Sequence, residues 1–333
     1  MEEVIIRSLS MCSKNTLIYS MFVLAYFVII VMALCLGEEN INPVQLYEYV
    51  FIHNDTLNQK IIDARLSRVV MAILIGMLLS SSGAITQNVF SNPIADPYII
   101  GIASAATFGA IVAYLLGFED YYGIFAFICS SIFSFFVFKI ASKTSISILL
   151  IIGIATSSFL GAFTSFFTYV IGEDSFKVVA WLMGNIGLSS WYHVQILILP
   201  LFLSLLYFYI NKNALNILLS GDEEAKNLGV DAYGLRIKLL IVSSLAVSFA
   251  VAFTGIIAFV GLIIPHVVRL IFKTYDNAIV IPYSIVFGGI FLLISDIIAR
   301  TLLSPVQIPI GIITALFGSP IFLYLALKSK KGF

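Results

Sequence analysis

The feature that most constrains this chain is a series of apolar runs, each long enough to cross a lipid bilayer. A membrane-spanning helix needs about 20 consecutive, mostly apolar residues. The sequence contains ten such runs, at approximately residues 16–36, 66–88, 98–117, 121–140, 146–170, 191–210, 237–255, 257–272, 281–299 and 307–327. Because lipid offers backbone groups no hydrogen-bond partner, and because these runs are too long and too uniformly apolar for barrel strands, each is expected to be a helix. The sequence therefore predicts an all-α, polytopic membrane protein in which residues 1–333 form one transmembrane domain.

Composition supports a membrane location. Of the 333 residues, 60% are hydrophobic and only 11% are charged, and the mean hydropathy is +1.06. A soluble domain is typically about 45–50% apolar and about 25% charged. The net charge is zero. We therefore expect a lipid bilayer as the surroundings and no nucleic-acid partner.

The division of lysine and arginine between the two sides of the membrane predicts the orientation. Cytoplasmic loops carry an excess of these residues. With the N-terminus inside, thirteen positive residues fall on the inner side and five on the outer side, the five being Lys60, Arg65, Arg68, Lys177 and Arg300. Both termini are therefore expected in the cytoplasm, with the first run kept as a membrane span and not cleaved as a signal peptide.

The sequence contains no motif typical of a nucleotide or metal site. The phosphate-binding pattern G-x-x-x-x-G-K-[ST] is absent, so any ATP that drives transport must be bound by another chain. The cysteines and histidines lack the spacing of metal ligands; they are Cys12, Cys35, Cys129, His53, His193 and His266. We expect no catalytic residue, no metal and no cofactor on this chain.

One inner connection is long enough to have structure of its own. Residues 211–236 read NKNALNILLSGDEEAKNLGVDAYGLR, and Gly221 and Gly229 are expected to divide this segment into two short helices. Its charges, Asp222 and Lys226 among them, fit a solvated loop that neutralises itself. Its apolar stripe instead fits a docking surface for a cytoplasmic partner; the stripe comprises Leu215, Leu218 and Leu219. The residues alone leave both readings open.

The fifth apolar run is rich in hydroxyl groups, which it carries on Thr156, Ser157, Ser158, Thr164 and Ser165. They fit either a polar route through the membrane or hydrogen bonds between packed helices. Apart from Asp296, toward the outer end of the ninth run, no acidic or basic residue lies near the middle of any run. An ion-coupled carrier needs such groups, so this class is disfavoured.

The stretch RLSRVVMAILIGMLLSSSGAITQNVFSNPIADPYIIGI, residues 65–102, resembles the signature of the FecCD-type permeases. These are the membrane subunits of bacterial and archaeal ABC importers for iron chelates, haem and cobalamin. In that family R-L-P-R opens the second span, and G-x-x-x-Q-x-x-x-x-N-P-L-A-x-P closes it. The blocks GLIIPHVVRLI, SDIIAR and PIGIITALFGSPIFLYL match the family's C-terminal motifs in the same order. Ser67 replaces the usual proline, which is expected to relax the turn that presents the two arginines, and Ile94 replaces leucine.

The resemblance implies a type II ABC importer permease in the cytoplasmic membrane of a prokaryote. Such permeases work in pairs, so this chain would pair with a second copy of itself or with a sister permease. They receive substrate from an extracytoplasmic substrate-binding protein and are driven by two cytoplasmic ATPase subunits, which hold ATP and Mg. A ferric siderophore is the expected cargo, with cobalamin or haem as alternatives. From other classes, a channel and an ion-coupled secondary transporter are the alternatives.

The resemblance also implies roles for individual residues. Segment 214–231 aligns with the coupling helices that contact the ATPases, through Leu218, Leu219, Gly221, Asp222, Glu223, Glu224, Ala225, Leu228 and Gly229. Thr144 and Ser145 align with the cytoplasmic gate. The fifth run aligns with the helix that lines the pathway, through Ser157, Ser158, Thr164 and Ser165.

Three outer arginines are the candidates for docking the binding protein. Arg65 and Arg68 are three residues apart and so share one helix face, and Arg300 lies at the outer end of the ninth run. Taken alone, each fits an anchor that reaches lipid headgroups. In the resembled family, arginines at these positions meet glutamates on the binding protein, and the planar guanidinium can bind a carboxylate through two hydrogen bonds. We therefore expect a docking site at these three residues.

Overall fold

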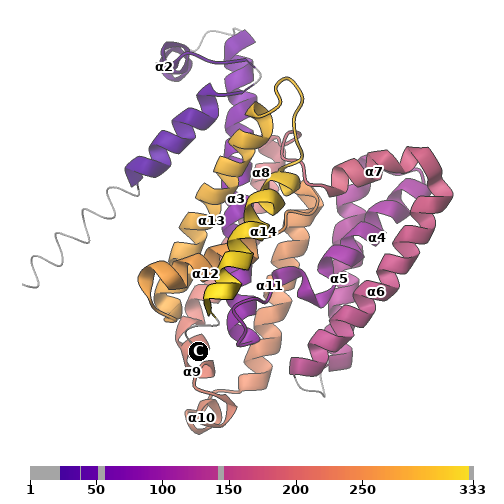
Figure 1. Cartoon of the computed structure of the whole chain (residues 1–333), viewed down its shortest axis with the longest axis vertical. Coiled ribbons are helices and arrows are strands. Elements are labelled where there is room, and N and C mark those ends of the chain that lie inside the picture. The colour runs from indigo at the N-terminus through magenta and orange to yellow at the C-terminus, as the bar shows by residue number, and fades with distance from the viewer. Residues whose placement is uncertain (1–22, 38, 52–56, 142–145, 330–333) are drawn as a thin grey trace, which may run out of the picture.

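The computed structural model describes residues 23–37, 39–51, 57–141 and 146–329, and in these ranges the chain is helical, without a β-strand (Figure 1). The first apolar helix is Val23–Cys35. The α-helices that follow are α2 (Pro43–Phe51), α3 (Leu57–Val89), α4 (Ile102–Leu115), α5 (Tyr122–Ala141), α6 (Ile146–Ile171), α7 (Ser175–Leu182), α8 (Trp191–Ile210), α9 (Lys212–Leu218), α10 (Asp222–Asn227), α11 (Ala232–Thr254), α12 (Val260–Phe272), α13 (Asn277–Thr301) and α14 (Ile310–Ser329). Three 3-10 turns join them, η1 (Pro97–Ile100), η2 (Glu119–Tyr121) and η3 (Gly172–Asp174). The predicted all-α class is confirmed.

Each apolar run in the sequence overlaps a helix of the structure. Within the described ranges, six helical stretches are long and apolar enough to cross a membrane, and four further apolar helices are shorter. Helix α3 begins at Leu57, well before the predicted residue 66, because its first turns are polar and hydropathy does not register them. The fifth helical stretch continues from Ile148 through η3 and α7 to Leu182, beyond the predicted residue 170.

Helix α3 runs through the middle of the bundle and packs against α8, α11, α12 and α13 (Figure 1). Small residues allow this close approach. A Cβ atom added at Gly83 would lie 1.9 Å from the carbonyl oxygen of Gly261 in α12. About one turn earlier on α3, the Ser80 hydroxyl donates a 2.7 Å hydrogen bond to the Ser284 carbonyl of α13. Two neighbouring helices therefore pack almost backbone to backbone on α3.

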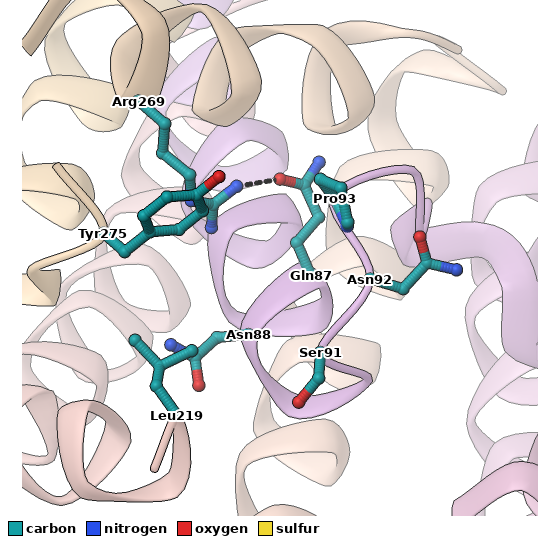
Figure 2. Close-up of a pocket in the computed structure, with 8 residues that line it drawn as sticks. All are labelled: Gln87, Asn88, Ser91, Asn92, Pro93, Leu219, Arg269 and Tyr275. Atoms are coloured by element: carbon teal, nitrogen blue, oxygen red, sulfur yellow. Dashed lines mark hydrogen bonds between the residues drawn. The ribbon is translucent and has the colours of Figure 1, made fainter. Parts of the chain in front are cut away.

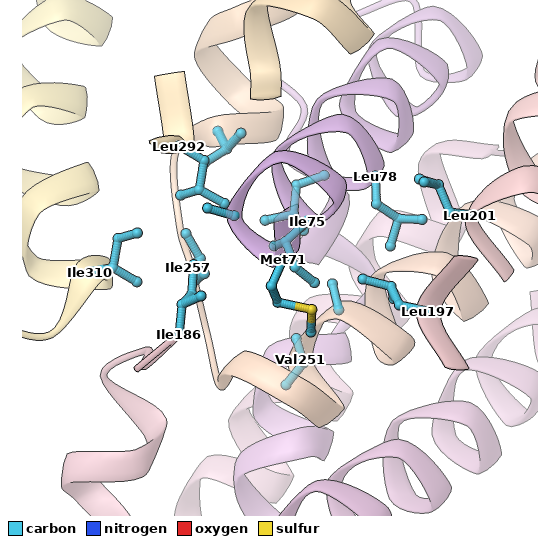
Figure 3. Packing of buried hydrophobic residues seen from close by; sticks show 14 of the residues in the cluster. Met71, Ile75, Leu78, Ile186, Leu197, Leu201, Val251, Ile257, Leu292 and Ile310 are labelled. Carbon is cyan, nitrogen blue, oxygen red and sulfur yellow. The ribbon is translucent and has the colours of Figure 1, made fainter. Parts of the chain in front are cut away.

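The main apolar core surrounds α3 (Figure 3). Met71, Ile75 and Leu78 of α3 are fully buried. The side chains around them come from α8, α11, α13 and α14 and include Leu197, Leu201, Val251, Leu292 and Ile310. Each large apolar side chain removed from solvent contributes about 1.5–3 kcal/mol. These contacts hold α3 as the central helix of the bundle.

Because of its close helix contact, Gly83→Ala is expected to lower the thermal unfolding midpoint of the purified permease. The added methyl group meets backbone at Gly261 and not a flexible side chain, and overpacking of this kind costs about 1–3 kcal/mol. Gly161→Ala is the matched control, because a Cβ at Gly161 in α6 meets nothing within 4 Å. Equal midpoints for the two variants would contradict the close α3–α12 contact.

Helices α4, α5, α6 and α7 form a second group beside the central helices (Figure 1). Phe108 of α4 lies at its centre, with ring centroids 6.4 Å from those of Phe133 in α5 and of Phe163 and Phe167 in α6. Among the described residues, helix α6 is the most exposed of the long apolar helices, with only 17% of its most apolar part buried. One broad side of α6 is therefore left for lipid, for a partner or for a pathway.

The two ends of the bundle carry different elements. Helix α2 lies at one end, and α9 and α10 lie at the other (Figure 1); we call these the α2 end and the α10 end. The predicted docking arginines lie toward the α2 end, since Arg65 and Arg300 both bond to backbone that follows or ends the helix Val23–Cys35. The predicted coupling segment forms the α10 end.

Candidate functional site

Two of the three arginines at the α2 end share one buried carboxylate. Arg68 Nε lies 2.9 Å from Asp296 Oδ1, and Arg300 Nε lies 3.3 Å from Asp296 Oδ2. The Asp296 side chain is completely buried, and Arg68 also donates to Gln307 Oε1 at 2.8 Å. Two positive charges face one negative charge, so this cluster keeps a net positive charge.

The third arginine binds the chain segment that follows the first helix. Arg65 Nη1 donates to the Leu34 carbonyl at 3.0 Å, and Nη2 donates to the Glu39 carbonyl at 2.5 Å. Arg300 Nη2 also donates to this region, to the Ala33 carbonyl at 2.6 Å. The structure thus brings Arg65 and Arg300 together at the end of the first helix, and Arg68 is joined to Arg300 through Asp296.

The three arginines differ in accessibility. Arg300 is only 3% exposed, and its guanidinium is held by Asp296 and the Ala33 carbonyl. Arg65 is half-buried, and the Arg68 side chain is 12% exposed. In this conformation Arg300 is buried, whereas Arg65 and, to a smaller extent, Arg68 keep part of their surface exposed. Docking of a binding protein at the three arginines stays a prediction. Sequence reasoning also missed Asp296 as the counter-ion, although its i, i+4 spacing to Arg300 was a usable signal.

The predicted coupling segment is folded as two short helices, α9 and α10, as the glycine positions predicted. Gly221 has φ +109° and Gly229 has φ +79°. Backbone of this kind is strained for any residue with a Cβ atom. Each glycine ends or begins a helix where the chain must turn sharply, so the segment depends on both.

Part of the predicted apolar stripe faces inward. Leu215, Leu218 and Ala225 are buried against the neighbouring helices, Leu218 being only 2% exposed. Leu219 and Leu228 remain exposed, the latter at 66%. The expected stripe of Leu215, Leu218 and Leu219 is therefore corrected. Two of its members anchor the segment, because a helix this short is held in place by burying its apolar side.

The acidic turn of α10 carries the exposed groups of the segment. Glu223 and Glu224 point into solvent. Asp222 pairs with Arg236 of α11 at 2.6 Å, whereas the sequence suggested a pair with Lys226. The pair with Arg236 ties α10 to the first turns of α11, so the two glutamates and the exposed leucines are presented on a fixed support.

Helix α9 is also tied to the start of α13. The Asn216 amide donates to Asp276 Oδ1 at 2.6 Å, and its oxygen accepts from the Asn277 backbone N–H at 2.8 Å. Asp276 caps α13 by accepting from the Ala278 N–H, and this bond together with the Asn216 amide lowers the pKa of the Asp276 carboxyl. The same helix α13 holds Asp296 near its other end, so it physically joins the coupling segment to the arginine cluster.

The hydroxyl groups of α6 form two neighbouring columns. Ser158 and Ser165 are seven residues apart and exposed, and Ser157 and Thr164 have the same spacing and are half-buried. Spacing of seven returns a side chain to nearly the same helix face. The four predicted pathway residues therefore lie on one broad side of the exposed helix α6. The predicted gate residues, Thr144 and Ser145, lie outside the described residues.

Comparison with known proteins identifies the fold of this helical bundle as that of a type II ABC importer permease. A solved structure described as a metal-chelate type ABC transporter in an inward-facing conformation aligns with a TM-score of 0.80 and 31% identity, over 92% of this chain and 97% of that chain. The predicted fold is thereby confirmed.

Residues 24–328 match the FecCD transport family, and the chain belongs to this family. It is 31% identical to the hemin transport system permease protein HmuU of Yersinia pestis, over 92% of this chain and 97% of the relative. It is 39% identical to the cobalamin import system permease protein BtuC of Halobacterium salinarum, over 78% of this chain and 71% of the relative. The chain is therefore a polytopic permease of the ABC importer type, a transport component of a larger complex.

Proposed function

We propose that this chain is the permease subunit of an ATP-driven importer that carries an iron chelate, a ferric siderophore, across the cytoplasmic membrane. Its membership of the FecCD family over residues 24–328 carries the proposal. The metal-chelate description of the structural neighbour favours an iron chelate. Relatives named for hemin and cobalamin keep these two cargoes as alternatives.

The proposed mechanism is alternating access. A loaded substrate-binding protein docks at the α2 end, which faces outward, and two ATPases that hold ATP and Mg dock at the α10 end in the cytoplasm. Closure of the ATPases moves α9 and α10, and this movement reorients the permease and its partner, either a second copy or a sister permease. Substrate passes along α6, and Thr144 and Ser145 gate its release. This chain carries out no covalent chemistry.

Reconstituted transport tests this proposal. The permease is placed in proteoliposomes with its ATPase and binding protein, and uptake of a ferric siderophore, hemin and cobalamin is measured with ATP and with a non-hydrolysable analogue. We expect uptake that needs ATP, persists with ionophores present and is fastest for the ferric siderophore. Uptake without ATP would indicate a channel, and uptake abolished by ionophores would indicate an ion-coupled carrier.

Glu223→Lys and Glu224→Lys are expected to uncouple ATP hydrolysis from uptake while leaving the permease folded. Both glutamates are exposed on α10, and reversing an exposed interfacial charge costs about 1–2 kcal/mol through lost and repulsive pairs. The measurements are ATPase co-purification and the ratio of substrate imported to ATP hydrolysed.

Glu173→Lys is the matched control for this test, since Glu173 is an exposed glutamate of η3, outside the coupling segment. It should behave as the unmodified chain in both assays. Normal uptake by the α10 variants would show that the ATPases dock elsewhere. Leu218→Asp is unsuited to this test because Leu218 is buried, so the change would disturb the segment itself.

A further inference from the structure

A small pocket lined by several polar side chains lies at the α10 end of α3 (Figure 2). Its volume is about 140 Å³, and its lining comes from the last turn of α3, the turn that follows, the end of α9, the end of α12 and the connection from α12 to α13. The lining residues are Gln87, Asn88, Ser91, Asn92, Pro93, Leu219, Arg269 and Tyr275. A single water needs only about 10–15 Å³ of such space. The pocket can therefore hold a small polyatomic ligand.

The pocket contains a buried positive charge without a negative partner. Arg269 is 8% exposed. Its Nη1 donates to Gln87 Oε1, and the Gln87 amide in turn donates to the Leu262 carbonyl at 2.8 Å. Among the described residues no carboxylate lies within ion-pair distance of Arg269, and the Tyr275 ring centroid lies 6.0 Å from its guanidinium. A buried charge left without a counter-charge costs several kcal/mol, so this site favours an anion.

The rest of the lining suits an anion as well. The other polar side chains of the pocket are neutral amides and hydroxyls, none of them acidic. Gln87 and Arg269 lie toward one side of the space, and Asn88 and Ser91 toward the other (Figure 2). Asn88 is 4% exposed, and its Oδ1 has no hydrogen-bond partner in the described part of the chain. Rotation of the amide exchanges its oxygen and nitrogen, so Asn88 can donate across the pocket to a bound oxyanion.

We propose that this pocket binds an oxyanion of the phosphate type, with Arg269 as its charged ligand and Asn88 as a neutral donor. A guanidinium binds phosphate oxygens through paired hydrogen bonds. The phosphate group can come from a phospholipid headgroup or from free phosphate. Leu219, at the end of α9, forms part of the wall, so the bound anion lies beside the coupling segment. The proposal stands on the pocket and does not depend on which substrate the permease carries.

The test measures the thermal unfolding midpoint of the purified chain as phosphate replaces chloride at constant ionic strength. We expect phosphate to raise the midpoint of the unmodified chain. In Arg269→Gln the phosphate concentration for half of the effect should rise at least tenfold. In Lys273→Ala it should not change, because Lys273 is an exposed cation next to the end of α12 and outside the pocket.

A second variant keeps the test decisive if Arg269→Gln does not fold. Asn88→Asp has nearly the shape of the native side chain and places a carboxylate inside the pocket with Arg269. It should raise the midpoint in chloride and abolish the response to phosphate, because the pocket then holds its own counter-charge. No response to phosphate in the unmodified chain, together with no gain in Asn88→Asp, would overturn the proposal.

Phospholipid analysis separates the two sources of phosphate. The chain is purified from membranes, and bound lipid is counted by mass spectrometry under native conditions. A headgroup ligand predicts one lipid retained by the unmodified chain, lost from Asn88→Asp and displaced by added phosphate. Free phosphate predicts the midpoint shift with no difference in retained lipid. Lipid retained equally by Asn88→Asp, with no midpoint shift by phosphate, would reject the pocket as the site.

Discussion

The Asp296→Asn variant is expected to unfold at a markedly lower temperature than the unmodified chain. Asp296 is completely buried and faces the guanidinium groups of Arg68 and Arg300 at 2.9 Å and 3.3 Å. Removing its charge leaves two positive groups, one of them fully buried, without a counter-charge. Breaking a buried pair in this way costs about 3–5 kcal/mol. Thermal unfolding of the permease in detergent is the measurement.

Two further variants test whether the lost stability comes from the unpaired arginine charges. Asp120→Asn changes an exposed aspartate before α5 and should leave the midpoint unchanged. Asp296→Asn combined with Arg300→Met removes one of the orphaned charges and should recover part of the loss, since a buried pair can often be replaced by apolar groups without penalty. If the single variant unfolds at the native temperature, the arginines do not depend on Asp296.

Arg65→Glu is expected to weaken docking of the loaded substrate-binding protein by about 2–5 kcal/mol if the residue is buried in the interface. Arg68→Glu should do the same. Each change replaces a positive group at the proposed docking surface with a negative one, so an acidic partner residue is repelled. A complementary Glu→Arg change on the binding protein should recover part of the affinity. The measurement is the dissociation constant on permease embedded in nanodiscs, at low and moderate salt.

The contacts of Arg65 and Arg68 determine how the docking affinities of these two variants should be interpreted. Arg68→Glu would also place a second carboxylate beside Asp296, so its docking result counts only if its unfolding midpoint is close to native. Arg65 bonds to backbone carbonyls at Leu34 and Glu39, and its replacement leaves the Asp296 cluster intact. Lys238→Glu, an exposed change near the start of α11 at the α10 end, is the control. Unchanged affinity of Arg65→Glu at both salt concentrations would mean that Arg65 is a membrane-edge anchor only.

The buried state of Arg300 changes how docking would work. Its guanidinium is covered by the backbone near Ala33, and Arg65 holds the adjoining carbonyls. For Arg300 to meet a partner carboxylate, this cover would have to move and Asp296 would have to release it. Arg65 is partly exposed, whereas Arg68 is only 12% exposed and is itself paired with Asp296, so Arg65 is the most accessible of the three. The sequence predicted docking roles for all three arginines, because spacing and composition carry no information on what covers each side chain.

In the coupling segment, too, the sequence predicted the local structure but not the burial of individual side chains. The positions of its two helices followed from Gly221 and Gly229, because positive φ is a local property of the backbone. The glycine positions did not predict which leucine is exposed. Leu218 and Leu219 are neighbours in a short helix, and only contact with other helices determines that the first is buried and the second exposed.

The sequence by itself determined three properties of this protein: its lipid surroundings, its all-α fold class and its family. Ten apolar runs require helices, because a helix satisfies its backbone hydrogen bonds within one segment of chain, and the FecCD motifs are contiguous in the sequence. Only the tertiary structure decided that Arg68 pairs with Asp296, 228 residues away, and that Arg269 lines a pocket with no acid beside it. The physical reason is that burial and charge pairing depend on contacts between helices that are distant in the chain, and these contacts arise only when α12 and α13 close on α3.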